Sequence, residues 1–366
     1  MFRHYQRSKQ GTRHFPKRTI MEKATIKEIA ALAGVSPTAV SFVINGRGGV
    51  SPLTEQKILD IIKKTGYSPN AASRQLTSKI SHNIAILYPA SASPFSDLFY
   101  CEVTDGLVSG LTQSSYNAVF CPYQPDTLNT TPDIIRKEDA AGAIFFQDVQ
   151  PSLLAALGEL KLPYVILDSS APSDGIQYVS LDCEHFIMTA MEYLVEKGHS
   201  RIAFLGIQNP PTYYLRCFSG YQKALVRLSL PLEVSWIQQC SDRYRDTRSC
   251  MERLWAVPAC RPTALCCSND LAAAHAIQAA FALKIEIPEQ LSIISIDDTI
   301  LSRHVKPSLT SVHCSKQDMG RMAAELVLKK IREPSDTAMN PKNPWQTLTI
   351  MERESVKDIR THSKSP

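Results

Sequence analysis

Seven short apolar segments that alternate with helical stretches constrain the fold of this 366-residue chain more than any other feature. Each is a nearly continuous apolar run, which is typical of a strand buried on both faces of a parallel sheet. The segments span residues 83–88, 116–121, 141–147, 163–168, 201–206, 263–268 and 291–297. Seven strands are too many for one modest sheet, so we expect two α/β lobes that divide near residues 182–184.

Polar residues follow three strand-like segments. Asp182 ends the run YVSLD, Asn269 and Asp270 end TALCCSND, and Asp297 and Asp298 end LSIISIDD. Ligands of parallel sheets bind beyond the carboxyl ends of the strands, where carboxylates and amides accept hydrogen bonds from hydroxyl and amine groups. The sequence therefore predicts a ligand pocket between the lobes. Helix capping is the competing interpretation, and it stays equally open for Asp270 and Asp298.

A different pattern precedes the strands. The stretch ATIKEIAALAGVSPTAVSFVING, residues 24–46, predicts two short helices joined at Gly34. Thr25 is suited to cap the first helix, and Gly34 tolerates the positive φ of a sharp turn. Ser36 followed by Pro37 starts a second helix, from 37 to about 44. Its outward face carries Thr38, Ser41, Phe42 and Asn45.

A third helix is predicted within residues 50–67, where Ser51 is the cap. Its apolar stripe comprises Leu53, Ile58, Ile61 and Ile62. Three short helices with a tight first turn are typical of a helix-turn-helix unit, whose second helix enters a major groove. Residues 66–79 follow as a turn and a short basic helix with one apolar residue, Leu76. This segment is either a linker or a hinge whose leucine wedges into a minor groove.

Charge separates the two parts of the chain. Residues 1–80 hold 14 Lys or Arg against 4 Asp or Glu, a balance of +10, and the net charge of +5 leaves −5 for residues 81–366. A basic front on an acidic body indicates a polyanionic partner for the front alone. The first twenty residues form a basic arm. We expect this arm either to be disordered or to be absent because translation starts at Met21. The alternative is an arm that adds nonspecific affinity for DNA phosphates.

The motifs resemble those of the lactose repressor family of bacterial transcription regulators, in order and spacing, over about residues 25–356. They are TIKEIAALAGVSPTAVSFVING, VSPLTEQKILDIIKKTGYSPNAASRQL, GHSRIAFLG, RPTALCCSNDLAA, PEQLSIISIDD and PSLTSVH. The resemblance implies an N-terminal all-α helix-turn-helix domain. It also implies an α/β periplasmic-binding-protein-like (type I) domain with two lobes and parallel sheets.

The resemblance also implies roles for single residues. Base-reading positions are Pro37, Thr38 and Phe42, and Leu76 is the minor-groove lever. The whole implied DNA-binding set is Thr25, Ser36, Pro37, Thr38, Ser41, Phe42, Asn45, Ser51, Thr54, Tyr67, Asn70, Ser73 and Leu76.

Phe42 departs from the family pattern, which resembles V-S-R-V where this chain has VSFV. Phenylalanine cannot make the bidentate guanine contact of arginine, but it packs on a thymine methyl group. We expect an operator that differs at the bases facing Phe42. The competing interpretation is that Phe42 turns inward and reads nothing.

The implied effector site also departs from the family. It comprises Phe95, Asp182, Arg216, Asn269 and Asp297. A family arginine in a pattern like R-x-x-G falls on Cys217, and Arg216 lies one residue early, which on a helix is a rotation of about 100°. Either the loop slips by one residue and Arg216 still binds, or the regulator recognises a ligand without that arginine.

We expect the following domain organisation, in which the crossing points come from the resemblance. Residues 1–23 are a basic, disordered arm, 24–69 the helix-turn-helix domain, 70–82 the hinge, 83–356 the effector-binding and dimerisation domain, and 357–366 a disordered tail. Lobe 1 takes about 83–183 and 298–330, and lobe 2 about 184–297 and 331–356.

The expected partners are double-stranded operator DNA, a sugar-like or nucleoside-like effector, and a second copy of the chain; a tetramer stays open. The alternatives are a vestigial cleft with control by a protein partner or none and, more remotely, a sugar-binding or sugar-processing protein. No nucleotide-loop, zincin or hydrolase motif occurs, so we expect no catalysis, cofactor or metal. No apolar run of bilayer length and no signal peptide occurs, which predicts a cytoplasmic protein.

Overall fold

The computed structural model describes residues 24–44, 48–67, 81–124, 132–147, 149, 151–168, 177–208, 210–334 and 347–360. The chain divides into two compact units, Met1–Ile80 and Ser81–Pro366. The predictions for the basic arm 1–23, for Asn45 and for most of the hinge, with Asn70, Ser73 and Leu76, fall outside the described residues.

The first unit is a bundle of three helices, α1 (Ile26–Ala33), α2 (Pro37–Ile44) and α3 (Pro52–Thr65). Thr25 and Glu28 form a reciprocal capping box at the start of α1. Gly34 ends this helix with φ 68°, and the axes of α1 and α2 are bent by 105°. Both values are typical of a helix-turn-helix.

The core of this unit is small and comes from all three helices. Its buried residues are Ile29, Ala30, Ala33, Val40, Val43 and Ile58. The prediction that Leu53 joins the apolar stripe of α3 is wrong, because its side chain is 87% exposed. Leu53 precedes Ile58 by five residues, which places the two about 140° apart around the helix.

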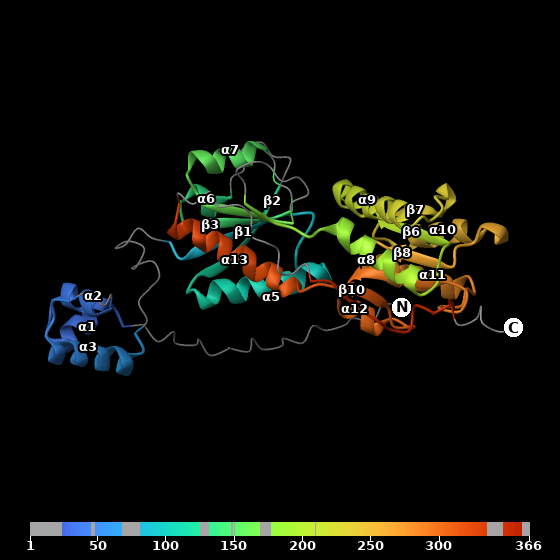
Figure 1. The fold of residues 1–366 in the computed structure, drawn as a ribbon. Helices are drawn as coiled ribbons and strands as arrows, with labels where there is room; N and C mark the ends of the chain where they lie inside the picture. The colour runs from blue at the N-terminus through green and yellow to red at the C-terminus, as the bar shows by residue number, and fades with distance from the viewer. Residues whose placement is uncertain are drawn as a thin grey trace, which may run out of the picture. The chain divides into compact units, whose positions relative to one another are not determined.

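The second unit contains two sheets that form two lobes (Figure 1). The first lobe has a parallel sheet in the order β2-β1-β3-β4-β5. The second has the order β11-β10-β9-β8-β6-β7, in which only the pairing of β11 with β10 is antiparallel. The strands are β1 (Asn83–Pro89), β2 (Asn117–Tyr123), β3 (Gly142–Phe146), β4 (Tyr164–Leu167), β5 (Tyr178–Val179), β6 (Ile202–Ile207), β7 (Ile237–Cys240), β8 (Ala264–Cys267), β9 (Ser292–Asp297), β10 (Thr310–His313) and β11 (Thr349–Met351).

Helices cover both sheets, as buried apolar strands require. The helices of the first lobe are α5 (Leu98–Gln113), α6 (Asp133–Arg136), α7 (Pro151–Glu159) and α13 (Lys316–Arg332). Those of the second lobe are α8 (Cys183–Glu196), α9 (Pro211–Arg227), α10 (Tyr244–Trp255), α11 (Asp270–Ala282) and α12 (Ile300–His304), with 3-10 turns η1 (Val234–Trp236) and η2 (Pro258–Cys260). Among the described residues no single helix is long and apolar enough to cross a membrane, although the bent pair α1 and α2 passes on length and composition together.

The chain returns to the first lobe later than expected. The prediction that residues 298–330 belong to lobe 1 is wrong for its first part, because β10 pairs in parallel with β9. Residues 298–309 supply the crossover that two parallel neighbours need. The chain leaves the second lobe after β10, α13 packs on α5 and β4 of the first lobe, and β11 then returns to the second sheet.

The predicted start of the disordered tail, at residue 357, is too early. Residues 357–360 are described, and they bind the end of α8 and the loop after it. The carbonyl of Lys357 lies 3.1 Å from Nε2 of His199, and the amide of Ile359 donates to the carbonyl of Lys197 over 2.9 Å. These contacts hold the segment against the second lobe because they satisfy backbone groups that would otherwise need water. Residues 361–366 lie outside the described residues.

Glycines let α5 and α13 approach until their backbones touch. A Cβ atom at Gly320 of α13 would lie 1.9 Å from the carbonyl oxygen of Val103, and one at Gly106 of α5 would lie 2.0 Å from that of Gln317. No side chain fits at either place. In Figure 1 the two helices lie side by side along the first sheet.

Gly320→Ala is therefore expected to lower the free energy of unfolding by about 3 kcal/mol, because α13 must move away from α5. Gly158→Ala in α7 is the matched control, since nothing lies within 4 Å of the added methyl group. Urea unfolding followed by circular dichroism measures both. Equal stability of the two variants would contradict the close backbone packing.

Candidate DNA-binding and effector-binding sites

The second helix of the first unit presents one face to its core and the other to solvent. Val40 and Val43 are buried, whereas Pro37 and Thr38 are exposed. The hydroxyl of Ser36 accepts a hydrogen bond from the amide of Ala39 over 3.2 Å, so it caps α2 as predicted. The outward face of α2 therefore carries polar and apolar side chains that the core does not use.

Phe42 points neither fully outward, as a base-reading residue would, nor fully into the core. The side chain is half-buried and is not part of the buried core. A methyl group added at Gly49 would lie 3.6 Å from Cδ2 of Phe42, so one edge of the ring rests on the backbone after α2. The positive φ of Gly49, 118°, allows this approach. Phe42 is thus supported at a fixed place while part of its ring stays accessible.

Several residues of the implied DNA-binding set stand at helix N-termini, whereas Ser41 lies within α2. Thr25, Ser36 and Ser51 stand at the starts of α1, α2 and α3, and the hydroxyls of Ser51 and Thr54 are 2.8 Å apart. A helix N-terminus attracts anions because its amides and its dipole point outward. Tyr67 instead packs, half-buried, against the core of the unit.

On the first lobe, aromatic and acidic groups meet where the strands end. Phe95 follows β1, is 54% exposed and has its ring centroid 4.8 Å from that of Phe120. The hydroxyl of Tyr100 donates to the carboxylate of Asp168 over 2.5 Å, and burial raises the pKa of Tyr100 well above its usual value. Asp97 caps α5 by accepting from the amide of Phe99 over 2.8 Å.

On the second lobe, two of the predicted effector ligands cap helices. The amide oxygen of Asn269 accepts from Ala272 over 2.9 Å at the start of α11. Asp182 is exposed and accepts from the amide of His185 over 3.1 Å at the start of α8. Each retains further hydrogen-bonding atoms, so an effector role stays a prediction for both.

Asp297 stands apart from these caps. It ends β9 with φ 102°, in the left-handed region that non-glycine residues rarely adopt. The residue is 9% exposed, and its backbone carbonyl accepts a hydrogen bond from the ammonium group of Lys316 over 2.6 Å. Burial, followed by the neighbouring charge of Asp270, raises the pKa of Asp297 well above its usual value. A mostly buried carboxyl group with a shifted pKa at a strand end is a candidate ligand-binding group.

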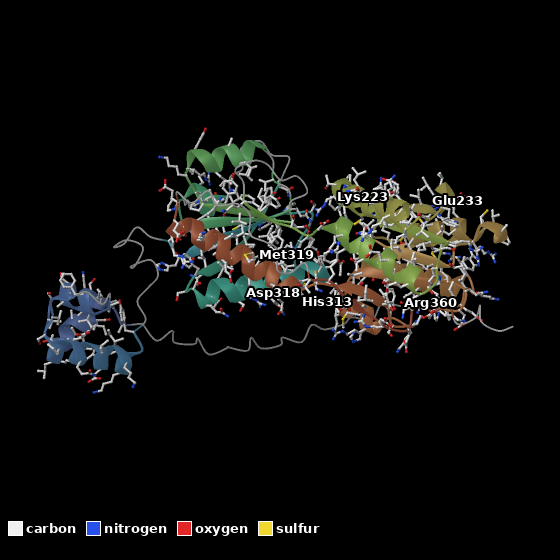
Figure 2. The ribbon with its side chains drawn as sticks, viewed as in Figure 1. Lys223, Glu233, His313, Asp318, Met319 and Arg360 are labelled. Carbon is white, nitrogen blue, oxygen red and sulfur yellow. The ribbon has the colours of Figure 1, made fainter. Side chains whose placement is uncertain are left out.

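The carboxyl groups beside Asp297 have structural partners. Asp270 accepts hydrogen bonds from Ser295, Ser311 and Thr299, at 2.5 to 2.9 Å, and holds β9 and β10 to the start of α11. Asp298 accepts from Arg353 over 2.5 Å, from Ser302 and from Nδ1 of His313, which is labelled in Figure 2. The capping interpretation is wrong for both residues, because the N-cap residues are Asn269 of α11 and Thr299 of α12.

Arg216 reaches the crossover between the lobes. Its guanidinium donates to the carbonyl of Leu181, and Asp168 of the first lobe is among its charged neighbours. Cys217, at the position of the family arginine, is fully buried. Arg216 thus lies at the junction of the lobes, and it already donates one hydrogen bond to the backbone. Whether it binds an effector or the ligand is bound without it stays a prediction.

Comparisons with known proteins support both the helix-turn-helix unit and the two-lobed unit. A model of bacterial regulatory proteins of the lacI family matches residues 25–70, and a periplasmic binding protein-like domain matches residues 191–356. The HTH-type transcriptional repressor PurR of Haemophilus influenzae (strain PittEE) is 31% identical over 343 residues, which cover 92% of this chain and 99% of PurR. The chain belongs to the lacI family.

Other lacI-family relatives extend the comparison. Catabolite control protein A of Priestia megaterium is 31% identical over 310 residues, which cover 83% of this chain and 92% of that protein. The lac repressor dimer bound to operator and the anti-inducer ONPF has a TM-score of 0.76 at 20% identity and covers 92% of this chain and 100% of its own. The fold class predicted from the motifs is thereby confirmed.

Four residues near the strand ends were missed by the sequence analysis, namely Tyr100, Asp168, Tyr213 and Lys316. The hydroxyl of Tyr213 donates to the carbonyl of Ser268, the hydroxyl of Tyr100 donates to the carboxylate of Asp168, and Lys316 donates to the carbonyls of Asp297 and Asp298. Asp168 ends the strand segment 163–168, so the strand-end rule could have found it. Tyr213 and Lys316 lie in helices, where no pattern distinguishes them from surface residues.

The buried Asp298 carboxylate predicts an acid-dependent contribution to stability. Burial alone would raise its pKa, but hydrogen bonds from His313 and Arg353 lower it to about 2 from an ordinary 3.8. The folded-state pKa is the lower one, so the stabilisation is complete above pH 3.8 and is lost as the pH falls through 2.

Asp298→Asn should therefore lose roughly 2 kcal/mol of unfolding free energy at pH 7, and this loss should shrink as the pH approaches 2. Asp105→Asn, at an exposed position of α5, is the control. Urea titrations between pH 7 and 3 measure both variants. A pH-independent difference would show that the ion pair does not supply the stabilisation.

Proposed function

We propose that this protein is a sequence-specific transcription regulator, acting as a repressor, that binds a pseudo-palindromic operator as a homodimer and responds to a small molecule in the interlobe cleft. The observation that carries the proposal is the helix-turn-helix unit, in which α2 crosses α1 at 105° and keeps its outward face outside the core. Membership of the lacI family and its similarity to the repressor PurR support it.

The outward face of α2 supplies the proposed base contacts. Pro37 and Thr38 are exposed, and the supported ring of Phe42 offers an apolar edge instead of the donors of an arginine. An apolar side chain recognises the C5-methyl group of thymine, whereas a bidentate arginine recognises guanine. We infer that this regulator reads a thymine opposite Phe42.

Phosphate contacts position that helix. Thr25, Ser36 and Ser51 lie at helix starts, where the amides attract anions. The charge of +10 within residues 1–80 adds attraction that does not depend on sequence and that falls with salt. Asn45, Asn70, Ser73 and Leu76 remain proposed contacts that lie outside the described residues, with Leu76 as the minor-groove wedge.

Selection of bound sequences from a random double-stranded DNA pool tests the proposal, with protein beginning at Met21. A palindromic motif with thymine at the position facing Phe42 is expected. Phe42→Ala should weaken operator binding by about tenfold and relax the preference at that base pair alone. Val226→Ala, at a position of α9 that is 83% exposed, is the control. Absence of any enriched sequence would contradict the proposal.

The cleft is proposed to hold a small-molecule effector. Asp297 carries this step, because it is 9% exposed and stands at the carboxyl end of β9, where ligands of parallel sheets bind. The alternative, a vestigial cleft with control by a protein partner, is supported by the replacement of the family arginine with Cys217.

Nothing favours catalysis, and within the described ranges no group of three His, Cys, Asp or Glu side chains is placed to hold a metal ion.

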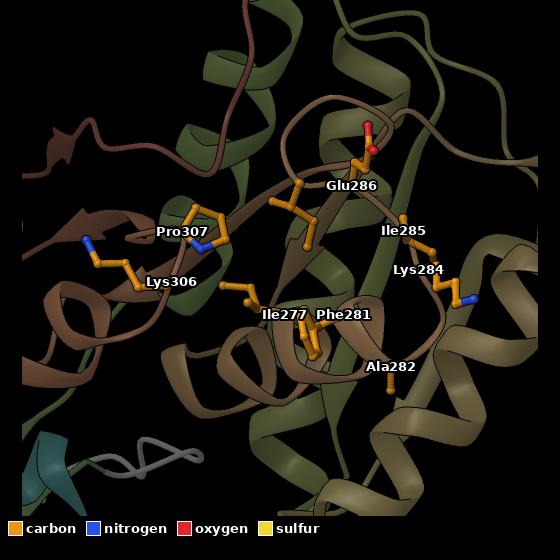
Figure 3. A pocket seen from close by; sticks show the side chains of 9 residues that line it. Ile277, Phe281, Ala282, Lys284, Ile285, Glu286, Lys306 and Pro307 are labelled. Carbon is orange, nitrogen blue, oxygen red and sulfur yellow. The ribbon is translucent and has the colours of Figure 1, made fainter.

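An apolar surface on the second lobe suits the second copy of a homodimer. Phe281 of α11 is 87% exposed and lies in a pocket with Ile277, Ile285, Ile287 and Pro307 (Figure 3). A second pocket continues along α11 past Leu271 and shares Phe281. Exposed apolar patches of this kind are typical of protein interfaces.

Phe281→Asp is expected to convert the dimer into a monomer, because association would bury an unpaired carboxylate in an apolar interface. Sedimentation velocity at micromolar concentration measures the mass. Val226→Asp places the same charge at an equally exposed apolar position of α9 and should leave the mass unchanged. If Phe281→Asp remained a dimer, the interface would lie elsewhere on the protein.

A further inference from the structure

Two buried thiols lie close together where the chain enters the second lobe. Cys183 is the first residue of α8, directly after the crossing from the first lobe, and Cys217 lies in the second turn of α9. Their exposed fractions are 2% and 0%. The helices α8 and α9 lie side by side in Figure 1, so these thiols face each other across a helix contact.

The two helices approach until their backbones touch beside the thiols. A Cβ atom at Gly220 of α9 would lie 2.6 Å from the carbonyl oxygen of Glu184 and 2.8 Å from its Cα atom. Glu184 is the residue after Cys183, and Gly220 lies about one turn after Cys217 on the same side of α9. Backbones at this separation bring residues 183 and 217 within the reach of a disulfide bond.

The carbonyl oxygen of Leu181 marks the place where α9 meets the crossing. It accepts a hydrogen bond from the guanidinium of Arg216, and Sγ of Cys183 lies 4.0 Å from the same oxygen. A guanidinium beside a thiol favours the ionised thiolate, which is the form that reacts with oxidants. Cys183 is therefore placed to react first, and its neighbour in the chain, Asp182, is exposed to solvent.

Cys217 has the properties of the second thiol. Burial, followed by a hydrogen bond with Cys183, raises the pKa of Cys217 well above its usual value. Cys217 therefore stays a neutral thiol that is directed at the sulfur of Cys183. A sulfenic acid formed at Cys183 would meet this thiol before any other, and a sulfenic acid condenses with a neighbouring thiol.

We propose that Cys183 and Cys217 form a reversible disulfide when hydrogen peroxide oxidises the protein. The sulfur of Cys183 bonds to one peroxide oxygen, the O–O bond breaks, and the departing hydroxide leaves with the thiol proton as water. The sulfur of Cys217 then bonds to the sulfur of the sulfenic acid. The S–O bond breaks, and the hydroxide leaves with the proton of Cys217 as a second water. The two thiols lose two electrons, which reduce the peroxide.

Other buried thiols of the second lobe are directed elsewhere. Sγ of Cys250 and Sγ of Cys240 lie 3.2 and 3.7 Å from main-chain carbonyl oxygens. Cys266 and Cys267 are successive residues of β8, so their side chains point to opposite faces of the sheet. These environments favour packed thiols over a second disulfide.

The disulfide would tie the crossing between the lobes to α9. The residues that lead from β5 of the first lobe end at Cys183, so the new bond holds the start of α8 in place. It also closes a long loop, from residue 183 to residue 217, which removes conformational freedom from the unfolded chain. Oxidation should therefore raise the melting temperature and slow local opening at the start of α8.

Peptide mapping by mass spectrometry tests the proposal on the full-length protein. The protein is treated with a molar excess of hydrogen peroxide, free thiols are alkylated, and the digest is analysed without reduction. The main intramolecular link should join Cys183 to Cys217, with a mass lower by two hydrogens than the two thiol peptides. The melting temperature should rise by about 5 °C. Amide hydrogen exchange in the first turn of α8 should slow about tenfold. Dithiothreitol should reverse all three changes.

Serine variants locate the bond. Cys183→Ser and Cys217→Ser should each abolish the link and the rise in melting temperature. Cys314→Ser is the matched control, because Cys314 is also buried and is a neighbour of Cys183, and this variant should retain both effects. Should a serine variant fail to fold, as judged by circular dichroism, the wild-type peptide map and Cys217→Ala decide the question.

The proposal is overturned if Cys183 links to Cys314 or to any other cysteine, or if its sulfenic or sulfinic acid accumulates without a link. It is also overturned if both thiols stay free in the folded protein while the same treatment in urea oxidises them. An oxidised protein with the link but with unchanged melting temperature and amide exchange would overturn the stiffening of the crossing.

Discussion

The buried ammonium group of Lys316 ties the two lobes together at the cleft. It belongs to α13, which packs on the first lobe, and it donates to the carbonyls of Asp297 and Asp298, which end β9 of the second. Glu102 of α5 completes its environment. A fully buried charge is tolerated only when its protons are used, so these groups fix each other's positions.

The same contact links the cleft to the helix pair of the first lobe. Lys316 is the first residue of α13, and one turn later Gly320 brings that helix onto the backbone of α5. A displacement at the end of β9 would therefore be transmitted to α13 through this contact, because close-packed backbones cannot absorb it locally.

Much of the architecture follows from local patterns in the sequence. All but one of the apolar runs that predicted strands are buried strands, because a parallel sheet covered on both faces has no polar side. The exception is β2, which lies at the edge of the first sheet and is mostly half-buried. The helix-turn-helix follows from Thr25, Gly34 and Ser36, whose capping preferences act within a few residues. The strands β5, β7, β10 and β11 were missing from the seven segments. β5 has only two residues, and β7, IQQC, is an edge strand with polar side chains.

The cleft was harder to predict because its properties arise between distant segments. The strand-end rule found Asp297, Asp270 and Asp298 alike, but it could not show that Asp270 and Asp298 accept hydrogen bonds from neighbouring strands and loops. Their partners, such as Ser311 and Arg353, come from strands and loops that only the sheet order brings near. The return of the chain after β10 was misplaced for the same reason, because strand pairing is not written in any one segment.

The return of α13 to the first lobe has a consequence for how the protein is made. The first sheet needs a helix that is synthesised only at residues 316–332, after most of the second lobe, so its core stays incomplete through most of translation. Residues 24–67 contain their own buried core and need nothing that follows. The helix-turn-helix unit is therefore folded on the ribosome long before the lobe that would regulate it.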